Sequence, residues 1–337
     1  MDGTPFGRRP PRRRRHRIAL AAGAAAAIAA IVGIVLVVAL TGNNERRSSP
    51  PAPAPSSTAK PGPFTGVYRA DFGPSTTNEK ADDGATPSTG EWSVRSACRP
   101  TGCVATATAK DGPTVQSTFV FDDYGGQWHA ISTASVPAAP PGVSGFDGCQ
   151  FPAEIWTAIT LQPRPDGTLA GQYRAASKVS NCHAERSVTF TRISDVDLTS
   201  LPDPASQPPR VISPANALHG RYHITATPDD TRPPSSSDLS IETDCLRTGE
   251  RCVSYQHATG EYATLVFAED NWTYGVDGTR PCHDGGTAQD TVEWTLPLPQ
   301  PPQNPITLLT GRERLQVNGT ACAGWYGGAL KYERTGD

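Results

Sequence analysis

Two patterns of hydrophobic residues divide the chain. Residues 18–40 form one apolar run without a charged side chain, whereas from residue 64 onward short segments alternate apolar with polar positions. The run predicts a membrane-spanning helix, because its 23 residues at about 1.5 Å each cover a hydrocarbon core of about 30 Å. The alternation predicts β-strands that bury one face.

The residues before the apolar run set the expected orientation. Residues 1–17 hold seven arginines and one acidic residue, and positively charged flanks stay in the cytoplasm. We expect a single-pass protein of the plasma membrane with a cytoplasmic Arg-rich tail (1–17) and an extracytoplasmic C-terminal bulk. A cleaved signal peptide is the alternative, although its apolar region usually has only about 7–15 residues. Small residues spaced along the span also permit a homodimer through the transmembrane helix.

Proline-rich stretches divide the remainder. Residues 41–63 are rich in Pro, Ala and Ser, and residues 195–216 contain five prolines. Such stretches are extended and semi-rigid, so both are interpreted as linkers. Between and after them lie unit 1 (64–194) and unit 2 (217–337).

The two units share an order of motifs. Each opens with a Gly-x-Tyr segment, carries four cysteines and has a tryptophan after its third cysteine, namely Trp156 and Trp294. The fourth cysteine, Cys182 or Cys322, lies eleven residues beyond a glycine in both units. We infer a tandem repeat.

The strand pattern predicts the fold class. Unit 1 contains about eight strand-length segments separated by turn signals such as Asp166-Gly167. Consecutive hairpins make an antiparallel meander, which removes its exposed edges by closing. We expect an all-β fold with two tandem meander units, either small up-and-down, lipocalin-like barrels or sandwiches. The expected strands of unit 1 lie near 66–72, 90–97, 103–109, 115–121, 127–133, 154–161, 168–175 and 186–192.

The cysteines predict disulfides. They all lie in the part expected outside the membrane, where disulfides persist. Close spacing pairs the first two cysteines of each unit, and the other two would then staple a long loop. Other connectivities stay open from sequence, and structural zinc is a weaker alternative because such sites use closely spaced pairs twice. The expected disulfide cysteines are Cys98, Cys103, Cys149, Cys182, Cys245, Cys252, Cys282 and Cys322.

No motif points to catalysis. Cys182 and Cys282 each precede a histidine, but they do not correspond in the repeat, and a disulfide-bonded cysteine is no nucleophile. No phosphate-binding loop or dinucleotide glycine pattern is present in the sequence. We therefore expect no enzyme, no cofactor and no metal site. Three acidic doublets are interpreted as solvated turns: Asp82-Asp83, Asp122-Asp123 and Asp229-Asp230.

Charge and aromatic residues limit the kinds of partner that we expect. The net charge of −3 includes the Arg-rich tail, so the rest of the chain is acidic and no nucleic-acid partner is expected. The tryptophans fit either a packed barrel core or the lining of a small ligand cavity. They are Trp92, Trp128, Trp156, Trp272 and Trp294.

Four segments resemble a known module: residues 64–73, 92–107, 120–123 and 161–169. They are similar to an extracytoplasmic β-module of mycobacterial and other actinobacterial membrane proteins, found in the ectodomains of some membrane serine/threonine kinases. The resemblance covers residues 64–194 well and unit 2 loosely. The expected cytoplasmic part has only 17 residues, so we expect no kinase domain. The resemblance implies sensing or binding and supplies no catalytic residue.

These observations favour a membrane-anchored, non-enzymatic, sensor-like or binding protein of the cell envelope, with an envelope ligand or protein partner of unknown identity. A scaffold of an envelope complex is the alternative, and an envelope hydrolase with a dispersed site is less favoured.

Overall fold

The computed structural model describes residues 61–78, 80–81, 85–114, 117–136, 153–177, 182–258, 261–283, 285–320 and 322–337. The expected cytoplasmic tail, the expected membrane helix and most of the first linker lie outside these ranges. Ala59–Asp337 forms one compact unit. No helix within the described ranges combines the length and apolar character that crossing a membrane requires.

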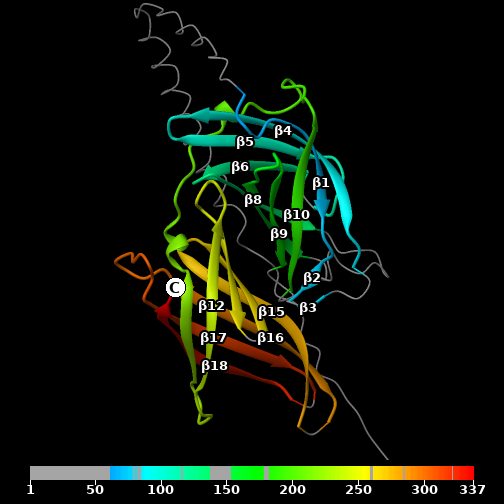
Figure 1. Cartoon of the computed structure of the whole chain (residues 1–337). Coiled ribbons are helices and arrows are strands. Elements are labelled where there is room, and N and C mark those ends of the chain that lie inside the picture. The colour runs from blue at the N-terminus through cyan, green and yellow to red at the C-terminus, as the bar shows by residue number, and fades with distance from the viewer. Residues whose placement is uncertain are drawn as a thin grey trace, which may run out of the picture. The chain divides into compact units, whose positions relative to one another are not determined.

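Unit 1 is an antiparallel eight-stranded barrel, called barrel 1 (Figure 1). It closes because β1 pairs with β4 on one side and with β10 on the other. A short hairpin, β2 (Thr76–Thr77) and β3 (Lys80–Ala81), adds to β10. The barrel strands are β1 (Gly66–Phe72), β4 (Ser88–Arg99), β5 (Gly102–Ala109), β6 (Thr118–Tyr124), β7 (Gln127–Val136), β8 (Ala153–Pro163), β9 (Leu169–Ser177) and β10 (Cys182–Ser194).

Unit 2 is a second closed eight-stranded barrel, called barrel 2. Each strand pairs with the next one along the chain, and β11 pairs with β18 to close the ring. The all-β prediction is therefore confirmed, and the structure has barrels rather than sandwiches. The strands are β11 (Gly220–Pro228), β12 (Ser235–Cys245), β13 (Cys252–Ala258), β14 (Glu261–Ala268), β15 (Asn271–Pro281), β16 (Thr287–Pro297), β17 (Leu308–Asn318) and β18 (Gly324–Gly336).

Both barrels close at the same kind of bulge, which explains the repeated Gly-x-Tyr motif. The register shifts just before Tyr68 in β1 and just before Tyr222 in β11. The glycine two residues earlier has φ of 152° at Gly66 and 101° at Gly220. A Cβ at Gly220 would lie 2.5 Å from the carbonyl oxygen of Gly336, so a side chain does not fit at this closure.

An arginine from the last strand ties each closure together. The Nε of Arg192 donates to the carbonyl of the residue before the bulge glycine at 3.1 Å, and the Nε of Arg334 does the same at 3.2 Å. Each guanidinium also pairs with the aspartate three residues later, Asp195 or Asp337. This shared geometry supports the inferred repeat through a further pair of matched residues, Arg192 and Arg334.

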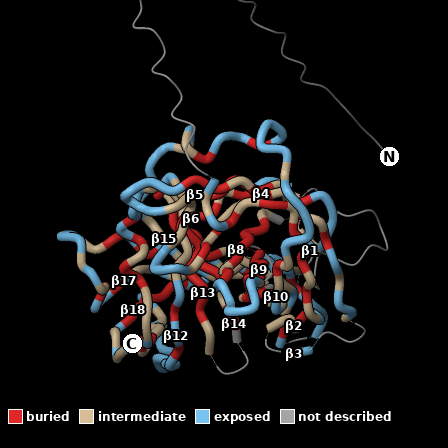
Figure 2. Tube along the Cα trace, turned by 45° about the horizontal axis from the view of Figure 1, so that its top comes forward, coloured by how far each residue is buried: buried red, intermediate tan, exposed pale blue. Residues whose placement is uncertain are grey.

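Aromatic side chains make up much of the core of barrel 1. Figure 2 shows buried positions, in red, along its strands. Phe64 packs on Phe121 with ring centroids 5.4 Å apart, and Trp92 packs on Phe190 at 5.2 Å. Inward positions recur at every second residue along the strands, as the alternation predicted. Burial of such large apolar side chains is the main stabilising contribution to the barrel.

The core of barrel 2 is more mixed. Trp272 is fully buried, and its Nε1 donates to the hydroxyl of Ser254 at 3.1 Å. The hydroxyl of Tyr222 donates to the carbonyl oxygen of Ile306 at 2.6 Å. These bonds satisfy polar atoms that would otherwise be costly to bury.

The second linker, residues 195–216, is bound to barrel 1 and is called the strap. The hydroxyl of Thr106 donates to the carbonyl oxygen of Pro202 at 2.7 Å, and Arg95 lies 3.1 Å from the carboxylate of Asp203. Two 3-10 turns shape it, η1 (Pro204–Ser206) and η2 (Pro214–Ala217). The strap is therefore a structural element with its own contacts as well as a spacer.

Three of the expected disulfides are present. They join Cys98 to Cys103, Cys245 to Cys252, and Cys282 to Cys322. The first two staple the β4–β5 and β12–β13 hairpins, as spacing predicted. Cys149 lies outside the described residues, so the expected Cys149–Cys182 bond stays a prediction.

Candidate functional site

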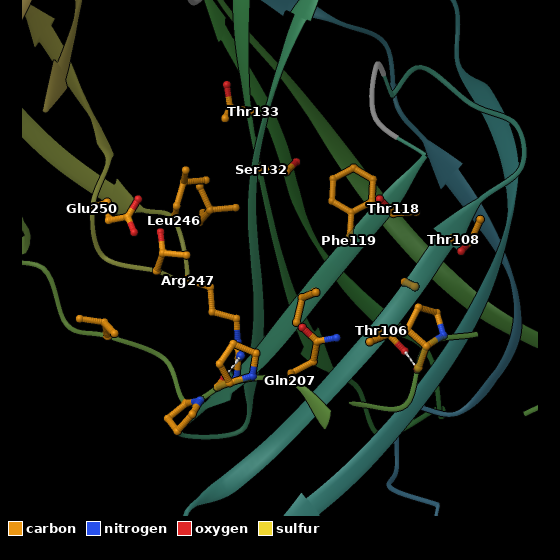
Figure 3. Close-up of a pocket in the computed structure, with 18 residues that line it drawn as sticks. Thr106, Thr108, Thr118, Phe119, Ser132, Thr133, Gln207, Leu246, Arg247 and Glu250 are labelled. Carbon is orange, nitrogen blue, oxygen red and sulfur yellow. Dashed lines mark hydrogen bonds between the residues drawn. The ribbon is translucent and has the colours of Figure 1, made fainter. Parts of the chain in front are cut away.

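A cavity of about 760 Å³ lies where barrel 1, the strap and barrel 2 meet, and it is called the inter-barrel cavity. Barrel 1 contributes strands β5, β6 and β7, and barrel 2 contributes the loop between β12 and β13 (Figure 3). The lining residues are Thr106, Ala107, Thr108, Thr118, Phe119, Val120, Ile131, Ser132, Thr133, Pro202, Gln207, Pro208, Pro209, Val211, Leu246, Arg247, Thr248 and Glu250.

Divergence of two strands forms the barrel 1 side of this cavity. β6 and β7 pair only next to their shared turn, residues 121–124 with 127–130. Beyond that point the strands separate, so Phe119 of the inner core and Ser132 of β7 both reach the cavity. The site therefore extends from the outer surface of the barrel to the edge of its core.

The strap and the β12–β13 loop hold the opposite side. The amide of Val211 donates to the carbonyl oxygen of Arg247 at 3.0 Å, which ties the strap to the loop. The Cys245–Cys252 disulfide closes the base of the same loop. Leu246 and Arg247 therefore face β6 and β7 from a cross-linked support (Figure 3).

A largely buried ion pair lies at one end of the cavity. The Nε of Arg247 is 3.0 Å from both carboxylate oxygens of Asp122, and Arg210 of the strap lies 3.7 Å from the same carboxylate. The guanidinium of Arg210 also covers the ring of Tyr124 at 4.8 Å. Charged groups at this end can therefore orient a polar group of a ligand.

A second ion pair joins barrel 2 to barrel 1 near the other end of the cavity. Arg251 lies 2.8 Å from Glu154, which also accepts a bond of 3.1 Å from the hydroxyl of Thr133. Burial alone would raise the pKa of Glu154, but hydrogen bonding and charge from Arg251 outweigh it and lower the pKa. Arg251 also lies over the ring of Trp156 at 5.2 Å.

Beside the cavity the barrels share an apolar contact. Trp156 and Ala176 of barrel 1 pack with Val253, Tyr255 and Val266 of barrel 2. At its margin Arg174 of β9 lies 2.5 Å from Glu242 of β12. Burial would lower the pKa of Arg174, but the neighbouring carboxylates raise it, so the guanidinium stays charged.

A buried histidine belongs to the same contact. The ring of His183 packs against Tyr255 at 5.2 Å and His257 at 5.2 Å. Burial first, then the neighbouring His257 and Arg174, lower its pKa to about 3. His183 is therefore neutral at physiological pH and acts as a packing residue of the contact.

The tryptophans have different positions. Trp92 and Trp128 belong to the core of barrel 1, and Trp272 to that of barrel 2. Trp156 faces outward into the contact between the barrels, whereas Trp294 packs against the core of barrel 2. The expected correspondence of the last two does not hold in the register, because Trp128 pairs with Leu161 and Trp272 with Leu296.

The residues that frame the cavity were not singled out from the sequence. Asp122 was interpreted as a solvated turn residue, but only 10% of its side chain is exposed and it pairs with two arginines. Its partner Arg247 is 125 residues away in the chain, and no local pattern indicates such a pair. Within the described ranges no cluster of three or more potential metal ligands is found.

The part of the chain that contains barrel 1 is similar to a known family. Residues 60–206 match the family model of the PknI serine/threonine-protein kinase sensor domain. A solved monomeric form of the Mycobacterium tuberculosis PknI sensor domain is 23% identical, with a TM-score of 0.33, and the match covers 45% of this chain and 99% of that one. No curated protein matches the chain.

Two further solved structures are similar over longer stretches. A protein of unknown function from the DUF3598 family of Nostoc punctiforme is 10% identical, with a TM-score of 0.19, and the match covers 81% of this chain and 97% of that one. Transferrin-binding protein B of Haemophilus parasuis is 8% identical, with a TM-score of 0.21, and the match covers 80% and 75%. The expected kinase-ectodomain resemblance is thus confirmed for residues 60–206, which match the PknI sensor domain family.

Proposed function

We propose that the chain is a non-enzymatic, sensor-like binding protein of the cell envelope. Residues 18–40 would anchor it, with the Arg-rich tail in the cytoplasm and both barrels outside. The match of residues 60–206 to a kinase sensor domain supports an extracytoplasmic role without catalysis. In this proposal the signal from the barrels passes to a separate partner in the membrane.

The observation that carries the proposal is the joint construction of the inter-barrel cavity. Its volume of about 760 Å³ lies within the usual range for small-molecule sites, about 300–1,000 Å³. Phe119, Ile131, Leu246 and the strap prolines offer apolar surface, while threonine hydroxyls and Arg247 offer a few polar contacts. The ligand class that fits is a small, mostly apolar molecule with one or two polar groups.

The same construction gives a means of signalling. A ligand in this cavity touches barrel 1, the strap and barrel 2 together. Its binding energy therefore favours the arrangement in which the three are in contact, and a population shift of that kind can be passed to a partner.

The orientation has its own test. A reporter that is active only outside the cytoplasm, fused after Asp337 of the full chain, should be active. A fusion of the same reporter before Met1 should be silent. The reverse pattern would overturn the proposed orientation.

The binding site is tested by hydrogen exchange on the full chain in lipid nanodiscs. An organic-solvent extract of the source envelope serves as the probe. Exchange should slow in β6, β7 and residues 246–251, because these segments line the cavity.

A matched pair of variants sharpens this test. Thr108→Trp places a large side chain in the cavity, whereas Thr191→Trp makes the same change on β10, away from the cavity lining. The slowing should vanish in Thr108→Trp and persist in Thr191→Trp. Equal slowing in both variants, or none in the unaltered chain, would refute the proposed site.

A further inference from the structure

A second cavity lies inside barrel 2 and is separate from the proposed inter-barrel site. It has a volume of about 580 Å³. Every strand from β11 to β18 contributes to its lining, and Asn78, between β2 and β3 of barrel 1, lines it as well. It is called the lumen cavity, and its polar side chains include Ser237, Gln256 and Glu313.

Comparison of the barrels indicates how barrel 2 gains this space. Six residues after the bulge glycine, barrel 1 has Phe72 and barrel 2 has Ala226. Phe72 is buried in the core of barrel 1 and packs edge-on against Tyr173, with ring centroids 5.7 Å apart. Ala226 lines the lumen cavity and leaves that volume free.

A second substitution in the repeat adds a carboxylate. Tyr173 lies two residues after Gly171, and Glu313 lies two residues after Gly311, the glycine that corresponds in the repeat. Glu313 lines the lumen cavity, and Arg232 and Asp229 are its charged neighbours, although neither forms a hydrogen bond or a close ion pair with it among the described residues. A tyrosine that fills barrel 1 is thus replaced in barrel 2 by an unpaired hydrogen-bond acceptor.

Two aromatic rings and an indole N–H group without a hydrogen-bond partner in the described part of the chain also line the cavity. Tyr274 and Trp294 have ring centroids 4.4 Å apart at an interplanar angle of 33°. The Nε1 of Trp294 is buried and has no hydrogen-bond partner among the described residues. A buried donor without a partner is costly, so a ligand acceptor at this point would be favoured.

The mixture of groups indicates the chemistry of the ligand. Ring faces bind the apolar C–H face of a compact ligand, Glu313 accepts from hydroxyl groups, and Trp294 donates to an oxygen. An organic cation would use the ring faces and the carboxylate but would leave the Trp294 donor unpaired. We propose that the lumen cavity of barrel 2 binds a neutral polyhydroxyl molecule of the size of a mono- or disaccharide.

Saturation-transfer NMR on the full chain in nanodiscs tests this site. The probes are maltose and N-acetylglucosamine, with tetramethylammonium chloride as the cationic comparison. At least one saccharide should receive saturation, and tetramethylammonium should not displace it. Absence of saturation transfer to both saccharides, or displacement by the cation, would overturn the proposal.

Two matched pairs of variants locate the binding. Glu313→Gln should weaken saccharide binding about tenfold through loss of a charged acceptor, whereas Glu293→Gln, an exposed change on β16, should not. Trp294→Phe removes the N–H group, and Trp325→Phe makes the same change at a side chain that is 67% exposed. Unchanged affinity in both Glu313→Gln and Trp294→Phe would place the saccharide elsewhere and refute the inference.

Discussion

Arg247 of barrel 2 and Asp122 of barrel 1 form a two-point ion pair, with the Nε of the arginine 3.0 Å from each carboxylate oxygen. Their side chains are 16% and 10% exposed, so the pair is largely withdrawn from solvent. Because the strap also places Arg210 near this carboxylate, one aspartate joins three parts of the molecule.

Asp122→Asn should lower the stability of the full chain. The change removes the charge that balances two arginines, and a lost bond to a charged group costs about 1.5–3 kcal/mol. The measurement is the free energy of unfolding in urea. Asp71→Asn is the control, because its exposed pair with Arg69 should contribute only about 0–1 kcal/mol. Equal losses in the two variants would contradict the joining role of Asp122.

Arg192 and Arg334, the arginines at the two barrel closures, should contribute differently to the free energy of unfolding. The side chain of Arg334 is 15% exposed and that of Arg192 is 47% exposed, although both make the same contacts. Arg334→Met should therefore destabilise the chain by about 1.5–3 kcal/mol and Arg192→Met by less than about 1 kcal/mol. Thermal unfolding of both variants checks the order. The reverse order would show that burial of the guanidinium does not set its contribution.

The fold could be predicted from sequence much better than the site. Strand alternation is local, so the eight segments expected in unit 1 all correspond to strands, and β1 matches its expected range of 66–72. The Gly-x-Tyr motif was visible as a repeat, but its reason, the bulge that closes the ring, depends on pairing between the first and last strands.

The site depends on contacts that no local pattern encodes. Asp122 and Arg247 meet across two barrels, and the Asp122-Asp123 doublet has the composition of a turn. Trp156 and Trp294 follow corresponding cysteines, yet differing strand offsets turn one outward and the other inward. The strap has a linker's composition, and only its hydrogen bonds to barrel 1 reveal the structural role.

The free energy of unfolding should fall as the pH is lowered, and His183 should be one cause. Burial, with His257 and Arg174, lowers its pKa from 6.5 to about 3. The unfolded histidine binds a proton as pH falls through 6.5 while the folded one does not, so its contribution is complete above pH 6.5 and is lost on descent towards about pH 3. The loss should be at most about 1.4 kcal/mol per pH unit.

Urea unfolding at several pH values between these limits measures this effect. His183→Phe should reduce the pH dependence while keeping an aromatic ring in the contact. If the free energy of unfolding depends on pH as steeply in His183→Phe as in the unaltered chain, His183 is not the source of that dependence.

The disulfides should stabilise the chain unequally. Cys282 and Cys322 are 40 residues apart, whereas Cys98 and Cys103 are 5 apart. Loop entropy predicts losses of about 4 and about 2 kcal/mol when each pair is replaced by serine. Unfolding of the two double variants measures this difference, and a larger loss for the short loop would contradict the entropic account.

Native mass spectrometry of the full chain isolated from its envelope tests the binding proposal most directly. The unaltered chain and Thr191→Trp should both carry a co-purified small molecule, and Thr108→Trp, which fills the inter-barrel cavity, should carry none. Equal occupancy in Thr108→Trp, or no bound molecule in any of the three, would contradict a ligand site between the barrels.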